Sequence, residues 1–235
     1  MATPTDLSAH LNLTGDPVTP RPSATVLLTR GRQPWELLLL RRPGGADFAP
    51  GAYVFPGGTV QTGDATWGDE IRGAAVRELF EEAGILLARR GRGFAGGRHC
   101  ERVRELVAQG GTFAAALGRL DLVPAFDRLV LFTRWVTPAV LRRRYDARFF
   151  LARVPAGQAV RPQEGEVTDW LWTSPERALA STEITLVYAT RAVIESVATG
   201  EEVTTLMARA RRLRHVPAVE PRLVQTDRGW EIVRD

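Results

Sequence analysis

The chain has 235 residues and 25.9 kDa, of which 44% are hydrophobic and 25% charged, an ordinary globular composition. No apolar run approaches the roughly 20 residues that a membrane-spanning helix needs. One cysteine, Cys100, excludes an intrachain disulfide, and no Cys/His cluster suggests zinc. Residues 1–22 lack the basic-then-apolar order of a secretory signal, so we expect a cytoplasmic protein.

The positive charge of the chain comes from arginine alone. All 31 Lys and Arg positions are arginine, and the net charge is +4. Apart from clusters at 142–144 and 209–214, the arginines are spread along the chain. This distribution is typical of solvated faces rather than of a nucleic-acid interface.

The predicted elements follow from apolar periodicity and from turn residues. In chain order, the predicted strands are Ala24–Thr29, Trp35–Leu40, Ala52–Phe55, Leu129–Val136, Phe149–Val154 and Val167–Trp172. The predicted helices are Glu70–Ala83, Glu101–Ala108, Thr112–Leu120, Glu176–Ala180, Ile184–Thr199 and Val203–Arg214. Strands on both sides of a central helix, without regular alternation, predict a mixed α/β sandwich.

The same pattern predicts how the chain is divided. Residues 1–22 are expected to form an extended arm, because their prolines prevent regular structure. Residues 23–200 form the main domain, with a helical insert at about 88–125 whose first part, 89–97, is predicted to be flexible. Residues 201–235 are expected to pack on the same domain as a helix and a tail with a weak hairpin.

The helix predicted at Glu70–Ala83 carries three acids on one face. Glu78 and Glu82 are four residues apart, and Glu81 is three residues from Glu78. Like charges at this spacing repel, so a purely structural helix gains nothing from them. Oxygen ligands on a rigid element suit a hard cation such as Mg²⁺. We therefore predict a divalent-cation site; the alternative is a solvated acidic face neutralised by neighbouring arginines.

The segment Arg77–Ile85 reads Arg-Glu-Leu-Phe-Glu-Glu-Ala-Gly-Ile. It matches half of the signature Gly-x5-Glu-x7-Arg-Glu-U-x-Glu-Glu-x-Gly-U, in which U is bulky and aliphatic, so the sequence resembles the Nudix hydrolase family. The front half departs from the signature. Strict register places Gly63 and Asp69 in its first two positions, whereas counting forward from the Pro-Gly-Gly turn reaches Asp64. Either Asp64 or Asp69 therefore fills the supporting acidic position.

The resemblance implies an α/β/α sandwich with a mixed sheet, and hydrolysis of a nucleoside diphosphate linked to another moiety with Mg²⁺ or Mn²⁺. The metal ligands of the family carry over to Glu78 and Glu82, with Glu81 as a third ligand. Glu81, Glu82 and Arg77 are the catalytic residues that the motif implies, and Arg77 would orient the glutamates by ion pairing.

A narrower resemblance covers more of the chain. Phe48–Gly58 resembles the lead of the acyl-CoA diphosphatase-like Nudix subgroup, as do Arg134–Pro138 and Arg144–Leu151. Gly57 and Gly58 close this lead and are assigned to substrate binding, and a backbone carbonyl near Gly58 is a further candidate metal ligand. The motif of bacterial coenzyme A pyrophosphatases is only half met.

Three side chains outside the helix complete the predicted site. Arg41 and Arg42 end a strand just before the glycine loop, where they would meet substrate phosphates. Glu166 stands three residues before Asp169 and resembles the family glutamate that assists metal binding or acts as the general base. The alternative for Glu166 is a charged turn before a strand.

Together these features predict a Mg²⁺- or Mn²⁺-dependent Nudix hydrolase that cleaves coenzyme A or acyl-CoA to 3′,5′-ADP and (acyl)phosphopantetheine. The alternatives are a pyrophosphatase for ADP-ribose or NADH and a Nudix-fold module that binds nucleotides without turnover. The expected partner is a small-molecule pyrophosphate, not a membrane or a nucleic acid. A homodimer is compatible with this interpretation.

Overall fold

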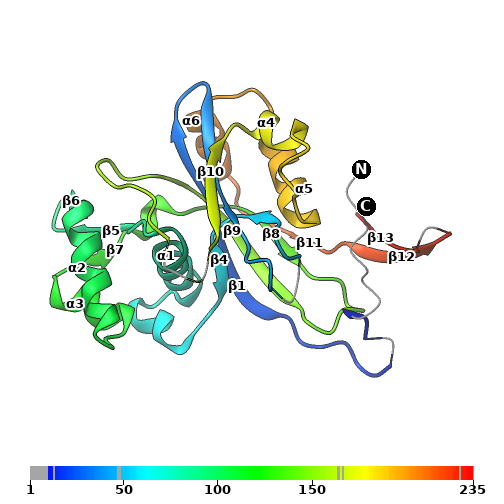
Figure 1. Ribbon diagram of the computed structural model, residues 1–235, viewed down its shortest axis with the longest axis horizontal. Coiled ribbons are helices and arrows are strands. Elements are labelled where there is room, and N and C mark those ends of the chain that lie inside the picture. The colour runs from blue at the N-terminus through cyan, green and yellow to red at the C-terminus, as the bar shows by residue number, and fades with distance from the viewer. Residues whose placement is uncertain are drawn as a thin grey trace.

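The computed structural model describes residues 10–12, 14–46, 49–162, 165, 167–227 and 229–234. Within these residues, an eight-stranded mixed sheet stands between two layers of helices (Figure 1). Its strands are β1 (Arg21–Gly31), β2 (Trp35–Arg41), β3 (Tyr53–Val54), β4 (Gly57–Thr59), β8 (Val130–Val136), β9 (Tyr145–Arg153), β10 (Asp169–Thr173) and β11 (Ala218–Val219). The main order is β10-β2-β1-β9-β8-β11, with β3 paired to β2 and β4 paired to β1.

The helices divide between the two faces of the sheet. They are α1 (Glu70–Ala83), α2 (Gly97–Ala108), α3 (Phe113–Arg119), α4 (Pro175–Ala180), α5 (Tyr188–Val197) and α6 (Val203–Arg211). The first three pack on one face and the last three on the other (Figure 1). In the described part of the chain, no helix is both long and apolar enough to cross a membrane.

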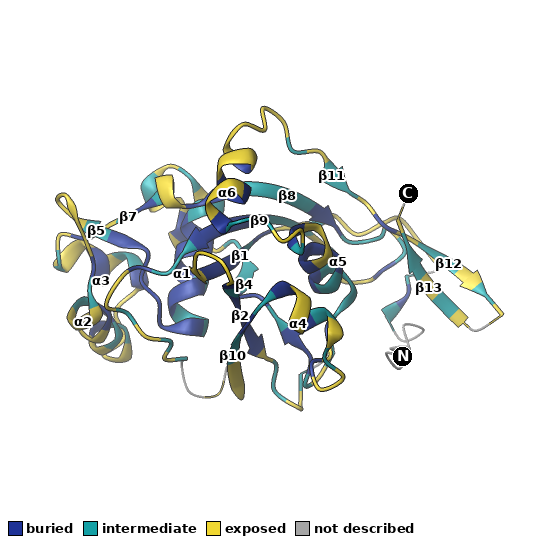
Figure 2. Ribbon diagram, turned by 90° about the horizontal axis from the view of Figure 1, so that it is seen from above, coloured by how far each residue is buried: buried dark blue, intermediate teal, exposed yellow. Residues whose placement is uncertain are grey.

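Two hydrophobic cores lie on opposite faces of the sheet. Leu38 and Leu40 of β2 belong to the core beneath α1, whereas Leu37 and Leu39 belong to the core beneath α5. Because side chains alternate along a strand, a run of four leucines fits a strand that is covered on both faces. Figure 2 shows this buried interior flanked by exposed loops. The predicted α/β/α sandwich is confirmed.

Helix α1 has the predicted limits because its end signals are local. The Asp69 carboxylate accepts a hydrogen bond from the backbone N–H of Arg72 at 3.0 Å, which caps the first turn. Gly84 adopts a left-handed conformation (φ 70°) and ends the helix.

The segment 89–97, predicted to be flexible, is ordered into strands, and this prediction was wrong. Strands β5 (Ala88–Arg90) and β6 (Gly93–Phe94) form a hairpin that pairs with β7 (Val123–Pro124). The Phe94 ring lies beneath the guanidinium groups of Arg89 and Arg128, at 5.1 and 4.9 Å from the ring centre. These cation–π contacts and the pairing with a distant strand hold the glycine-rich turn.

Other limits differ where distant segments pair. Strands β1 and β9 are parallel from Arg21↔Tyr145 onward, which lengthens both beyond the predicted strands. Helix α5 begins at Tyr188 rather than at 184, because the preceding residues are extended and Leu186 bridges to Tyr53. The C-terminal hairpin is present as β12 (Arg222–Thr226) and β13 (Gly229–Val233).

The single cysteine lies in α2 and contributes to the core. Cys100 is 5% exposed and packs in the same apolar cluster as Val103 and Leu106. Burial raises the pKa of its thiol, which keeps it protonated and unreactive.

Candidate active site

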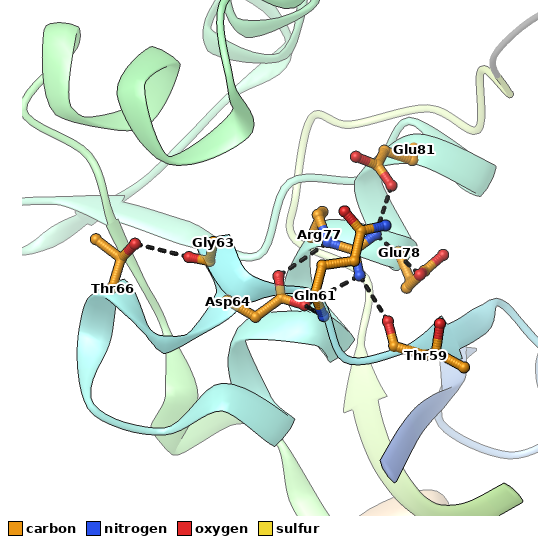
Figure 3. Close-up of polar contacts among 8 residues, drawn as sticks. All are labelled: Thr59, Gln61, Gly63, Asp64, Thr66, Arg77, Glu78 and Glu81. Carbon is orange, nitrogen blue, oxygen red and sulfur yellow. Dashed lines mark hydrogen bonds and ion pairs between the residues drawn. The ribbon is translucent and has the colours of Figure 1, made fainter. Parts of the chain in front are cut away.

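A buried arginine organises the acidic face of α1 (Figure 3). Arg77 donates to Asp64 through Nε (2.8 Å) and Nη2 (3.0 Å). Its Nη1 donates to Glu78 Oε1 at 2.8 Å and to Glu81 Oε2 at 2.7 Å. A further bond runs from Nη2 to the carbonyl oxygen of Thr59 at 3.0 Å. One guanidinium therefore fixes three carboxylates and the strand β4.

The same contacts hold Arg77 in its charged form. Burial alone would lower the pKa of its guanidinium. The hydrogen bond to Asp64 and the charges of Glu78 and Glu81 outweigh that effect and raise the pKa above its ordinary value. Arg77 is thus a permanent cation under the acidic face.

The structure distinguishes the two acids that the sequence left open. Asp64 lies on the 3₁₀ helix η2 (Thr62–Trp67), is 1% exposed and forms the paired contact with Arg77. Asp69 instead caps α1 and pairs with Arg72. The segment between the Gly57–Gly58 turn and α1 therefore folds into η2, which carries Asp64 to Arg77. Gly73 permits this approach, since a Cβ there would lie 2.2 Å from the Asp64 carbonyl oxygen.

The Gly57–Gly58 turn lies directly against the acids of α1. The backbone N–H of Gly57 donates to Glu82 Oε2 at 2.9 Å. A Cβ at Gly58 would lie 2.4 Å from the Glu78 Oε1 atom, and a Cβ at Gly57 would lie 2.4 Å from the Ala24 carbonyl oxygen. At Gly57, a side chain would clash with the backbone of β1. At Gly58, a side chain would displace the Glu78 carboxylate.

These groups lie at one end of a cleft of about 1080 Å³. Glu78, Glu82, Gly57 and Gly58 line it, whereas Glu81 is not among the lining residues and its carboxylate contacts Arg77. The structure therefore brings two of the three predicted metal ligands to the cleft together with the glycine turn.

Of the predicted site residues outside α1 and the glycine turn, one arginine lines the cleft and the other does not. Arg42 lines the cleft. Arg41 is exposed, does not line the cleft and donates from Nε to the Gly51 carbonyl oxygen at 3.3 Å. Glu166 lies outside the described residues, so its role as base or ligand stays a prediction.

Sequence reasoning missed the wall opposite the acids. Arg142 and Arg143, together with the aromatic residues Trp135 and Tyr188, line the same cleft. In the sequence, the two arginines stand out only as part of a charged run. Their place in the cleft depends on the pairing of β8 with β9, which no local pattern reveals.

Comparison with known proteins assigns the family. The family model described as NUDT19 Nudix domain matches residues 68–190, more than half of the chain. The chain belongs to the Nudix hydrolase family. This match contains Arg77 and all three glutamates, whereas the Gly57–Gly58 turn and Asp64 precede it.

The Nudix relatives include animal proteins and a bacterial structure. A Caenorhabditis elegans protein named nudix hydrolase 7 is 31% identical over 67% of this chain and 52% of its own length. The acyl-coenzyme A diphosphatase NUDT19 of Gallus gallus is 28% identical over 68% of this chain and 62% of its own. A NUDIX hydrolase from Alicyclobacillus acidocaldarius has a TM-score of 0.69 and 27% identity, covering 81% of this chain and 96% of that one. The chain spans about half to three fifths of the curated relatives that it matches.

Nudix hydrolases use divalent metal ions, and the donor groups here fit such an ion. Among the described residues, no group of three or more His, Cys, Asp or Glu side chains is arranged to hold a metal. Magnesium, however, is commonly bound by one or two carboxylates and completes its shell with water and substrate phosphates. Glu78 and Glu82 provide two carboxylates at the cleft, and the missing side chain of Gly58 makes the cradle in which the Glu78 carboxylate lies.

Proposed function

We propose that this Nudix protein hydrolyses the pyrophosphate bond of a nucleoside diphosphate derivative, with coenzyme A or acyl-CoA as the leading substrate. The observation that supports the proposal is the meeting of Glu78 and Glu82 with the Gly57–Gly58 turn at one end of a large cleft. A module that only binds nucleotides has no need to keep repelling acids together on one helix.

The chain's own residues supply positioning. Glu78 and Glu82 would hold a Mg²⁺ or Mn²⁺ ion, which when bound neutralises pyrophosphate charge and activates a water. Arg77 holds the Glu78 carboxylate, and the Gly57 N–H holds that of Glu82, so neither has to be ordered when substrate arrives. Water adds to one phosphorus and the anhydride P–O bond breaks. From coenzyme A, the products are 3′,5′-ADP and phosphopantetheine.

The substrate assignment rests on resemblance and on the shape of the cleft. Two relatives, from Gallus gallus and Homo sapiens, are named acyl-coenzyme A diphosphatases, each 28% identical to this chain. A cleft of about 1080 Å³ lies at the upper end of the roughly 300–1,000 Å³ that is usual for a small-molecule site, which leaves room for an elongated dinucleotide-like substrate.

A substrate panel tests this function. Coenzyme A, acetyl-CoA, ADP-ribose and NADH are each incubated with the protein and with Mg²⁺ or Mn²⁺, and products are identified by mass. Release of 3′,5′-ADP with phosphopantetheine is the expected result. Faster cleavage of ADP-ribose or NADH would replace the substrate but keep the reaction, and cleavage of none would reject the enzyme assignment.

Glutamine variants test the assigned acids. Glu82→Gln and Glu78→Gln should each lower kcat by orders of magnitude, because each removes a charged oxygen ligand. Glu82→Gln should leave folding unchanged, or improve it by about 0.2–0.5 kcal/mol for each like-charge pair relieved. Glu78→Gln also weakens the ion pair with the buried Arg77 and should lower the free energy of unfolding. Glu70→Gln is the matched control, since Glu70 is an exposed acid in the first turn of the same helix. Near-normal kcat in both test variants would move the site elsewhere.

A further inference from the structure

Acidic and basic side chains line the cleft from different elements, and Arg42, which follows β2, is one of its arginines. Glu78 and Glu82 are the acids that line it among the described residues, and both belong to α1. The loop between β8 and β9 contributes Arg142 and Arg143 to the lining. A pyrophosphate held by a cation at the two acids gives no reason for these two further arginines.

The strand register gives the separation of β4 and β8 across the cleft. Thr59 of β4 pairs with Ser23, Ser23 with Ala147, and Ala147 with Trp135 of β8, and all four residues line the cleft. Neighbouring strands lie about 4.8 Å apart, so these three steps span about 14 Å. The arginine loop follows β8 directly, so it lies on the β8 side of this span.

Aromatic side chains line the same cleft. The rings of Trp135 and Tyr188 meet edge to face with centroids 6.2 Å apart, and Phe149 lines the cleft beside them. A floor of this kind suits a ring or another weakly polar group. The lining therefore combines acidic, aromatic and basic side chains, which fits a ligand that carries more than one anionic group and a ring system.

The arginine loop is held in place by the N-terminal segment. Leu11 bridges to Leu141, and the backbone N–H of Arg142 donates to the His10 carbonyl oxygen at 2.9 Å. Arg142 Nε donates to the Leu11 carbonyl oxygen at 2.8 Å, which fixes the plane of its guanidinium. His10 itself lines the cleft. An anion site whose arginine is already oriented loses less entropy when it binds.

We propose that Arg142 and Arg143 bind a phosphomonoester carried by the same substrate whose pyrophosphate lies at Glu78 and Glu82. The inference rests on the proposed function and narrows its substrate to nucleoside diphosphate derivatives with a phosphorylated ribose. Guanidinium groups match the oxygens of a phosphate dianion with paired hydrogen bonds. Coenzyme A and NADPH both carry such a group, whereas dephospho-coenzyme A, NADH and ADP-ribose do not.

Matched substrate pairs test this selectivity. The ratio of kcat/KM is measured for coenzyme A over dephospho-coenzyme A and for NADPH over NADH. The wild-type chain should prefer the phosphorylated member of at least one pair, and that pair identifies the source of the phosphate. The Arg142→Ala/Arg143→Ala variant should lose about tenfold or more of this ratio through KM, since charge-assisted hydrogen bonds are lost.

The control variant is Arg211→Ala/Arg212→Ala, which removes the same two charges from exposed arginines at the end of α6. It should keep the wild-type ratio, which separates local contacts from the overall field of the protein. Arg143→Ala alone leaves the bond between Arg142 and Leu11 intact and should give part of the loss. Equal kcat/KM for both members of both pairs in the wild type, or an unchanged ratio in the double variant, overturns the proposal.

A binding measurement separates this inference from the proposed reaction. Calorimetry compares 3′,5′-ADP and 2′,5′-ADP with 5′-AMP on the wild-type chain and on the double variant. Tighter binding of a bisphosphate by the wild type alone supports the arginine site even if no substrate is hydrolysed. Hydrolysis accompanied by equal affinities for all three nucleotides keeps the reaction and rejects the arginine site.

Discussion

Two arginine–glutamate networks of this protein have similar chemistry and opposite environments. In the first, the Arg77 side chain is 6% exposed and contacts Asp64, Glu78 and Glu81. In the second, Glu101 of α2 is 51% exposed and accepts hydrogen bonds from Arg161 and Arg104. The bond from Arg161, supported by Arg104, lowers the pKa of Glu101. The first network fixes the geometry of the cleft, whereas water can replace the contacts of the second.

The comparison shows that the number of contacts in an ion-pair network does not measure how much the network contributes to stability. Breaking a buried ion pair leaves a charged group that water cannot reach. When an exposed ion pair is broken, water solvates both groups and the free energy of unfolding changes little.

The largest effect should follow removal of the buried cation. Arg77→Ala leaves the Asp64 carboxylate, whose side chain is 2% exposed, without its guanidinium partner, so the free energy of unfolding should fall by about 3–5 kcal/mol. Urea unfolding followed by tryptophan fluorescence measures it. Arg161→Ala, the control in the exposed network, should leave the urea midpoint unchanged. Equal shifts in the two variants would contradict the contrast.

The Gly57–Gly58 turn gives a further test of the buried network, because a side chain at each glycine would contact a different group. A methyl group at Gly58 meets the carboxylate of Glu78, so Gly58→Ala should displace that carboxylate from Arg77 and lower kcat at least tenfold, with a smaller loss of stability than a clash with backbone would cause. Gly57→Ala meets the backbone of β1 and should instead lower stability. Gly63→Ala has no atom within 4 Å of its Cβ and is the neutral control. A fully active Gly58→Ala would show that the position of Glu78 is not critical.

The smallest effect should come from the acid that caps α1. Burial alone would raise the pKa of Asp69, but hydrogen bonds from the backbone and side chain of Arg72 lower it overall. Asp69→Ala should cost about 1 kcal/mol of unfolding free energy with kcat retained. A carboxyl whose folded pKa is depressed stabilises the protein above its unfolded pKa of about 3.9. That part of the stability should disappear as the pH falls through the folded value, in urea titrations carried from pH 7 to well below the unfolded pKa.

Local signals in the sequence predicted α1 and its acids. The apolar spacing lies within the helix, and the Asp69 cap and Gly84 stop that the structure shows lie beside it, so the predicted limits agree with the structure. The choice between Asp64 and Asp69 could not be made locally. It depends on how η2 folds back over Gly73, a path that neither the count of residues nor the signature specifies.

Long-range pairing explains what else the sequence left out. The residues 89–97 looked flexible because of their glycines, yet their strand pairs with Val123 more than 30 residues away. Arg142 and Arg143 reach the cleft because β9 pairs with both β1 and β8 and because Leu11 holds the loop between the strands. Neither arrangement leaves a periodic pattern in the sequence.

The buried Cys100 also gives access to the dynamics of the helical layer that contains α2. Since the chain has a single cysteine and its thiol is 5% exposed, a thiol reagent can react only after α2 moves away from the core. The rate at which the Cys100 thiol is labelled in native buffer therefore measures local opening of this layer. Its dependence on urea separates that opening from global unfolding, because local opening exposes less surface and has a smaller slope.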